Sequence, residues 1–160
     1  MFMSKYETTH KKIIDAAITS FNQKTEKEIT VTDIIKLAQI HHSTFYRHFN
    51  SFDDLIREMF ESTMPDENLE QYSFSDSINI LVKFVEDNFV FFRNLLKNRG
   101  KFDIIFRYFF QKNIFKNNET FAANELIYRG TVGMLEGWLE NSDRINKDDV
   151  IHYLILLMRN

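Results

Sequence analysis

Cysteine is absent from this sequence of 160 residues, and proline occurs once, at Pro65. The lack of cysteine excludes disulfide bridges and thiolate metal sites and fits a protein of the cytoplasm. With one proline and four glycines, few residues interrupt a helix, so long periodic segments can continue as helices. No window approaches the roughly 18 uninterrupted apolar residues of a membrane-spanning helix. The amino terminus has no apolar signal-peptide segment, and we expect a cytoplasmic protein with no membrane partner.

The motifs of common enzyme classes are also missing. The sequence has no glycine-rich phosphate loop, no cysteine nucleophile, no nucleophile elbow, and no histidines and carboxylates at metal-binding spacing. Hydrophobic residues make up 44% of the chain and charged residues 27%, as in ordinary folded domains. We therefore predict a protein that is not an enzyme and has no catalytic residues and no cofactor.

Charge is unevenly distributed along the chain. The net charge of −3 by itself disfavours a nucleic-acid partner, because phosphate binding needs positive potential. Residues 1–50, however, contain seven Lys or Arg against five Asp or Glu, and four of the five histidines. Any surface that binds nucleic acid should therefore lie in the amino-terminal part.

Residues 1–62 show the patterns of four helices. Apolar residues three and four apart predict a first helix from Thr9 to Phe21. Thr30, with Asp33 three residues later, has the pattern of a capping box and starts a helix over about 31–38. Another short helix begins at Ser43. A fourth follows a second capping pattern, 51–54, and ends before Pro65.

Only residues 39–42 separate the second and third of these helices, so the two should cross steeply. Phe45 and Phe49 are four apart and should face inward, which leaves the polar side of the third helix exposed. Two short helices joined in this way form a helix-turn-helix, whose second helix enters the major groove of DNA.

The segment HHSTFYRHF, residues 41–49, allows other interpretations. It could be a solvated helix with two core phenylalanines, and its histidines could be metal ligands. His41 and His42 are adjacent and point differently, and no carboxylate lies one turn away on the same helix. We therefore predict no metal site, and DNA contact as the role of the exposed side chains.

The stretch ITVTDIIKLAQIHHSTFYRHFNSFDDLIREMF resembles the DNA-binding domain of the TetR family of transcriptional regulators. The resemblance covers residues 8–62, and ten positions match at the family's spacing: Thr30, Asp33, Ile34, Ala38, Thr44, Tyr46, His48, Phe49, Ser51 and Leu55. It implies an all-α fold, with a helix-turn-helix domain followed by a helical regulatory and dimerisation domain. It also implies a homodimer that binds a palindromic double-stranded DNA operator.

The resemblance also assigns roles to single residues. Its DNA-binding set is Thr32, His41, His42, Ser43, Thr44, Tyr46, Arg47 and His48. In this set His42, Ser43 and Thr44 approach base edges, Tyr46 meets a base or the backbone, Thr32 and His48 bind phosphates, and Arg47 adds a cationic contact. His41 replaces the family's usual serine.

Two further positions depart from the family pattern. Gln39 stands where the family has a glycine in the turn, and a left-handed backbone there would cost on the order of 1 kcal/mol. Phe52 replaces a lysine that commonly holds a phosphate, which should flatten the salt dependence of binding.

The second half of the chain also reads as helices. We predict one helix of about five turns over 78–96, an aromatic run over 102–110, a helix with three glycines and a periodic face over 123–141, and a last helix from about Lys147 to Met158. The stretches FFRNLLKNRG and YRGTVGMLEGWLENS resemble the regulatory domains of one branch of the family.

The aromatic cluster of this half has two interpretations, simple core or a cavity for a small apolar effector. In the family the regulatory domain binds an effector, and the two helix-turn-helix units of the dimer then move apart. The candidate pocket residues are Phe89, Phe92, Phe106, Phe109 and Tyr128.

A subunit interface is expected at the last two helices. Each mid-helix glycine should cost about 0.5–1 kcal/mol relative to alanine, which is compensated if another helix approaches closely. The last helix also has an apolar face too wide for a single-sided helix. The candidate interface residues are Gly130, Met134, Gly137, Trp138, Ile151, Leu154, Ile155 and Met158.

The sequence thus predicts two domains. Residues 1–62 should bind DNA, and residues 74–160 should bind an effector and dimerise. The expected activity is repression by occluding a promoter. The alternative is a dimeric helical interaction protein, or a transcriptional activator, whose DNA specificity is weakened by Gln39, Phe52 and the negative net charge.

Overall fold

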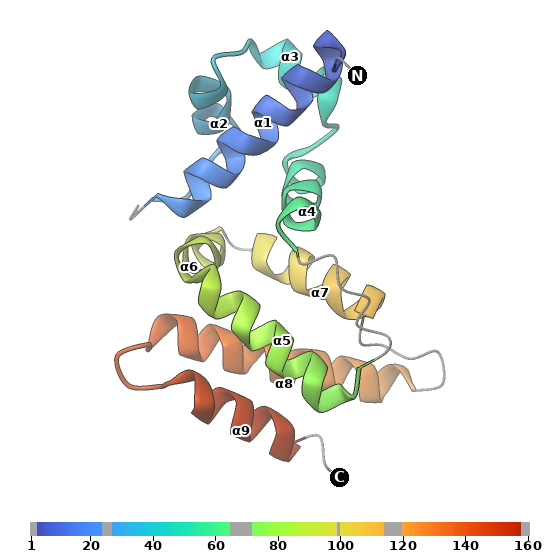
Figure 1. The fold of residues 1–160 in the computed structure, drawn as a ribbon, viewed down its shortest axis with the longest axis vertical. Helices are drawn as coiled ribbons and strands as arrows, with labels where there is room; N and C mark the ends of the chain where they lie inside the picture. Colours follow the sequence, from blue (N-terminus) through green and yellow to red (C-terminus); the bar gives the residue numbers. More distant parts are fainter. Residues whose placement is uncertain (1–2, 24–26, 65–71, 99, 114–119, 158–160) are drawn as a thin grey trace.

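The computed structural model describes residues 3–23, 27–64, 72–98, 100–113 and 120–157. These residues contain nine α-helices and no strand, so the predicted all-α class is confirmed (Figure 1). The helices are α1 (Lys5–Asn22), α2 (Val31–Ala38), α3 (His42–His48), α4 (Phe52–Thr63), α5 (Phe74–Asp87), α6 (Phe89–Lys97), α7 (Lys101–Asn113), α8 (Phe121–Glu140) and α9 (Lys147–Leu157). No helix among the described residues is both long and apolar enough to span a membrane.

Helix α1 begins at Lys5, earlier than the predicted start at Thr9. The Ser4 hydroxyl accepts a hydrogen bond from the Glu7 N–H at 3.2 Å, and the Glu7 carboxylate accepts one from the Ser4 N–H at 2.6 Å. This capping box stabilises a first turn with no apolar stripe, so the apolar period alone could not find it. The predicted Val31–Ala38 helix is confirmed.

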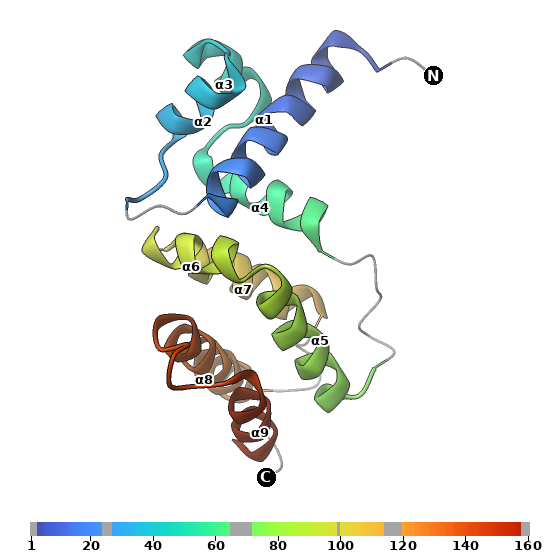
Figure 2. The ribbon, with the colours of Figure 1, turned by 60° about the vertical axis from the view of Figure 1, so that its left-hand side comes forward.

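The single helix predicted over 78–96 is wrong, because the chain bends at Asn88 and forms α5 and α6 instead (Figures 1 and 2). Asn88 has φ −118° and ψ 34°, and its side-chain amide donates to the Phe84 carbonyl at 2.9 Å. An asparagine that bonds to the backbone locally competes with the helical ladder, and the apolar spacing continues through the bend.

Helices α1–α4 form one end of the molecule and α8 and α9 the other (Figures 1 and 2). Between them, α6 packs against α1 and α7 packs against α4. The core runs through this junction, since the Phe60 ring of α4 meets the rings of Phe84, Phe92 and Phe109 edge to face, with centroids 5.9, 6.3 and 6.5 Å apart. Helices α1–α4, called the reading head below, and the remaining helices therefore share one aromatic core.

Candidate nucleic-acid interface

The turn between α2 and α3 is built on a left-handed residue. Gln39 has φ 50° and ψ 52°, its N–H donates to the Lys36 carbonyl at 3.1 Å, and the Ile40 N–H donates to the Ile35 carbonyl at 3.2 Å. These bonds satisfy carbonyls at the end of α2 and turn the chain sharply. The left-handed backbone expected at this position is confirmed, and a side chain there costs roughly 1 kcal/mol.

Helix α3 is held by two phenylalanines. Phe45 is 0% exposed and Phe49 3% exposed, and their rings lie 5.7 Å apart. This confirms the inward-facing pair expected from the spacing. The helix begins at His42, one residue before the predicted start, and His41 precedes it as an N-cap without a side-chain hydrogen bond.

The outer face of the helix-turn-helix carries most of the predicted DNA-binding side chains. Thr44 and His48 are half-buried, and the exposed members are Thr32, His41, His42, Ser43, Tyr46 and Arg47. The rings of His42 and Tyr46 lie 4.9 Å apart on successive turns of α3. All but Thr32 come from α3 and its N-cap, at the end of the molecule opposite α8 and α9 (Figure 1).

His48 is more enclosed than the sequence suggested. Its ring stacks on Tyr6 of α1 with centroids 4.2 Å apart, and its Nδ1 is buried without a hydrogen-bond partner among the described residues. Burial lowers the pKa of His48, and nearby His10 and Arg47 lower it further. The surroundings of His48 therefore favour its neutral form.

The sequence analysis missed a hollow beside His48. It has a volume of about 310 Å³ and is lined by Lys5, Tyr6, Thr9, Arg47 and His48. Two of these side chains are cations and two carry hydroxyls, a combination that suits a phosphate. The signal that could have found it is Ser4-Lys-Tyr-Glu7, because this capping box extends α1 until it lies beside the end of α3.

The first helix is also fixed to the fourth near this hollow. His10 Nε2 lies 2.5 Å from Glu58 Oε1 of α4, and the His10 ring stacks on Phe49 with centroids 4.7 Å apart. His10 of α1 thus packs against the buried core residue Phe49.

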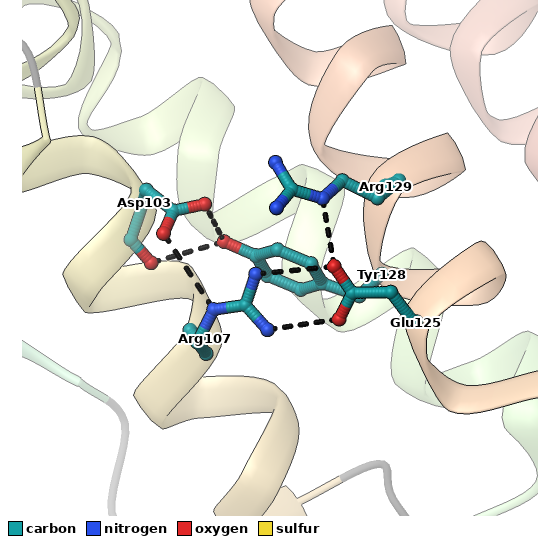
Figure 3. Close-up of polar contacts among 5 residues, drawn as sticks. All are labelled: Asp103, Arg107, Glu125, Tyr128 and Arg129. Carbon is teal, nitrogen blue, oxygen red and sulfur yellow. Dashed lines mark hydrogen bonds and ion pairs between the residues drawn. The ribbon is translucent and has the colours of Figure 1, made fainter. Parts of the chain in front are cut away.

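A polar network that the sequence did not reveal joins α7 to α8 (Figure 3). Arg107 donates to the Glu125 carboxylate at 3.0 and 3.4 Å, and Arg129 donates to it at 2.8 Å. These bonds, with Arg107 the larger contributor, lower the pKa of Glu125 to about 2. The hydroxyl of Tyr128 donates to Asp103 at 2.5 Å, and the Arg107 guanidinium lies 4.2 Å from the centre of the Tyr128 ring.

The candidate effector-pocket residues are mostly buried. Phe92, Phe106 and Tyr128 are 0% exposed and Phe109 is 2% exposed. Phe92 and Phe106 have ring centroids 5.5 Å apart, and half-buried Phe89 packs on Trp138 at 5.6 Å. The structure places these residues in or beside the buried aromatic core.

The candidate subunit interface divides into two groups. Trp138 is 5% exposed and Leu154 0%, so both belong to the chain's own core and offer no surface to a partner. Met158 lies outside the described residues. The half-buried members are Gly130, Met134, Gly137, Ile151 and Ile155.

A hollow of about 570 Å³ lies between α8 and α9, lined by Gly133, Met134, Gly137, Ile145, Asp149, Val150 and Tyr153. At all three glycines of α8, a Cβ atom would meet no described heavy atom within 4 Å. The close helix expected at these glycines is therefore not supplied by the described part of this chain.

Comparisons with known proteins agree with this geometry. Residues 13–59 match the model of the bacterial regulatory proteins of the tetR family. The HTH-type dhaKLM operon transcriptional activator DhaS of Lactococcus lactis subsp. lactis (strain IL1403) is 25% identical over 107 residues, which are 65% of this chain and 57% of DhaS. The alignment therefore spans little more than half of that relative.

Two solved structures share the fold. A TetR transcriptional regulator from Streptococcus agalactiae 2603V superposes with a TM-score of 0.70 at 21% identity, covering 98% of this chain and 96% of that one. A TetR transcriptional regulator from Rhodococcus sp. RHA1 gives a TM-score of 0.60 at 16% identity, covering 98% and 99%.

The helix-turn-helix, the match over its residues and the shared fold define a DNA-binding transcriptional regulator. Its residues 13–59 carry the DNA-binding domain of the tetR family of bacterial regulatory proteins, and the described helices share the fold of solved TetR regulators.

Proposed function

We propose that this regulator is a homodimer that binds a roughly palindromic duplex operator through α3. The observation that carries the proposal is the exposed row His42, Ser43, Tyr46 and Arg47 on a helix anchored by the buried Phe45. Such a helix fits the major groove, where hydroxyl, imidazole and guanidinium groups can bond to base edges and phosphates.

Phosphate contacts would flank this reading helix. Thr32 is exposed on the first turn of α2, and Lys5, Thr9 and Arg47 line the hollow beside His48. The two cations give this hollow positive potential in a chain with net charge −3. A backbone phosphate in the hollow would position α3 without reading sequence.

A second copy of the chain would cover the hollow between α8 and α9. The glycines there leave space for a partner helix, and exposed Tyr153 and Leu156 of α9 provide apolar surface. Two-fold symmetry then presents two α3 helices to half-sites spaced by about one helical turn or a multiple of it. The α8–α9 surface lies at the end opposite α3, which leaves both reading helices free (Figure 2).

The direction of regulation has two candidates. Repression by occluding a promoter is the expectation from the sequence, whereas the match to DhaS, whose name describes an activator, favours activation. A reporter gene placed behind the selected operator, with and without the protein, separates the two. A regulator of chromosomal DNA acts in the bacterial cytoplasm. A small apolar effector would have to open the packed aromatic cluster in order to bind there.

The proposal is tested by selecting duplexes from a random library with the purified protein and sequencing them, while its mass in solution is measured by light scattering. We expect a dimer and a motif with two-fold symmetry. A monomer, or a dimer that enriches no motif at low salt, would overturn it, and the second result would favour the alternative of a helical interaction protein.

A further inference from the structure

Two buried asparagines, Asn94 of α6 and its C-cap Asn98, bind backbone atoms at the end of α1 and just before α2. Asn94 is 4% exposed and Asn98 0%, and they lie one helical turn apart on the same face. The Asn94 side-chain amide donates to the carbonyl oxygens of Phe21 and Gln23, at 2.8 and 2.7 Å. It thus satisfies carbonyls at the end of α1 that no further turn of helix would bond.

Asn98 binds the residue that precedes α2. Its Oδ1 accepts a hydrogen bond from the Ile29 N–H at 3.2 Å, and its Nδ2 donates to the Ile29 carbonyl at 2.6 Å. The side chain therefore pairs with Ile29 as a second peptide group would. Ile29 is 6% exposed and adjoins Thr30, the N-cap of α2, so this pair sets where α2 begins.

The next two described residues continue this contact toward α4. Gly100 has φ +84°, a conformation that favours glycine, and turns the chain into α7. Lys101, the first residue of α7, forms an ion pair with Asp53 in the first turn of α4 and lies 5.4 Å from the centre of the Phe52 ring. Asn98 and Lys101, at the junction of α6 and α7, thus contact the residues at the starts of α2 and α4, the helices that flank α3 in the sequence.

We propose that Asn94 and Asn98 are positioning residues for DNA reading, because they fix the orientation of α2 and α3 relative to the regulatory helices. They act on DNA only through the backbone they bind. Unpaired amides and carbonyls at this buried junction would be costly, so the contact should persist in solution. The effect on DNA affinity rests on the proposed function, whereas the effect on orientation does not.

The first test uses the wild-type protein. Ile29 lies outside the helices, and its N–H has Asn98 as a hydrogen-bond partner. In native-state hydrogen exchange we expect the Ile29 amide to exchange as slowly as core amides of α1. Exchange as fast as that of an exposed loop amide would overturn the proposal.

The second test measures orientation and uses the absence of native cysteine. Lys36→Cys on α2 and Lys83→Cys on α5 introduce spin-label sites at two exposed positions, and dilution with unlabelled protein isolates the distance within one chain. Asn98→Asp is equal in size but cannot donate to the Ile29 carbonyl, and it places a carboxylate beside Glu28, whose Oε1 lies 3.4 Å from Asn98 Nδ2. We expect its label distances to broaden or shift.

The matched control is Asn79→Asp, the same change at an exposed position of α5. It should leave the distance distribution unchanged. Affinity for the selected duplex should fall about tenfold in Asn98→Asp if only about a tenth of the molecules keep the competent orientation. Unchanged distances in Asn98→Asp would overturn the proposal. If the variant loses its helical circular dichroism and is therefore unfolded, hydrogen exchange of the Ile29 amide in the wild-type protein decides. A wild-type protein that selects no duplex would refute the proposed function alone.

Discussion

Tyr6 and His48 stack with their ring centres 4.2 Å apart, so the first turn of α1 supports the last turn of the reading helix. This contact makes His48 part of the packing of the head as well as a candidate phosphate ligand. Its position therefore links the stability of the reading head to the protonation of one ring.

Acidification should destabilise the protein partly through His48. The pKa of His48 is lowered in the folded state from an ordinary value of 6.5, so the unfolded chain binds more protons just below that pH. The free energy of unfolding contributed by His48 is fully present above about pH 6.5 and is lost as pH falls through the lowered pKa. Urea denaturation between about pH 7.5 and pH 5 should show this loss.

The control for this prediction is His48→Phe, which keeps a ring against Tyr6 but does not titrate. Carboxylates contribute equally to the acid dependence of both proteins. The variant should lose less stability than the wild type over the same range, and equal slopes would contradict the prediction.

Substitutions on the reading face should separate specificity from electrostatics. Thr44→Ala and Tyr46→Ala should each weaken binding to the selected duplex by about 1–3 kcal/mol and relax the preferred sequence. Arg47→Ala should weaken binding to all duplexes and lower the salt slope by roughly one unit. Fluorescence anisotropy at several salt concentrations measures both effects, and three variants with wild-type binding would exclude this face.

Replacing Gln39 by glycine should stabilise the protein. The left-handed backbone at Gln39 costs a side chain roughly 1 kcal/mol, and glycine removes this cost. Gln23 is a matched control, because it ends α1 with φ −82°. Gln23→Gly should be destabilising by about 0.5–1 kcal/mol. Thermal unfolding of the two variants should shift in opposite directions, and a shift in the same direction would refute the role of the backbone angle.

Filling the open space at Gly133 tests the subunit interface. Within one chain a Cβ atom at exposed Gly133 would meet no described heavy atom within 4 Å, so we expect Gly133→Leu to be accommodated in the single chain. If a partner helix occupies this space, the dimer should weaken by about 1–3 kcal/mol from overpacking. Sedimentation velocity across a dilution series measures this. Asn79→Leu, which adds the same bulk to exposed α5, should leave the dimer intact.

Removing the hydroxyl of Tyr128 should loosen the connection between α7 and α8. The hydroxyl donates to Asp103, and the buried ring remains in Tyr128→Phe. Losing a hydrogen bond to a buried charged group costs about 1.5–3 kcal/mol. Asp103 is partly exposed, so water can replace the lost donor and we expect a loss below this range. Urea denaturation checks the loss. Tyr153→Phe, at an exposed hydroxyl, should change stability little.

The sequence predicted best where one local pattern determined the structure. Thr30 and Asp33 located the start of α2, and the spacing of Phe45 and Phe49 identified the inner face of α3. It failed at Asn88, where an asparagine interrupts a helix without breaking the apolar period. No proline lies near Asn88 to mark the end of a helix in the sequence.

The same rule holds for the candidate functional residues. Tyr46 and Arg47 could be placed on the outer face of α3 from periodicity, whereas the neighbourhood of His48 depends on α1, more than thirty residues away in sequence. Asn94 and Asn98 were part of a recognised stretch, but their partners are backbone atoms of Phe21 and Ile29, which no side-chain pattern identifies.

The position of Phe60 has a practical consequence for work on the DNA-binding half alone. Its ring packs into Phe84, Phe92 and Phe109, all of which lie beyond residue 62. A fragment cut after α4 would expose this ring to water and leave the carbonyls of Phe21 and Gln23 without Asn94. The head is therefore best studied while still attached to the helices beneath it, since truncation removes part of its own interior.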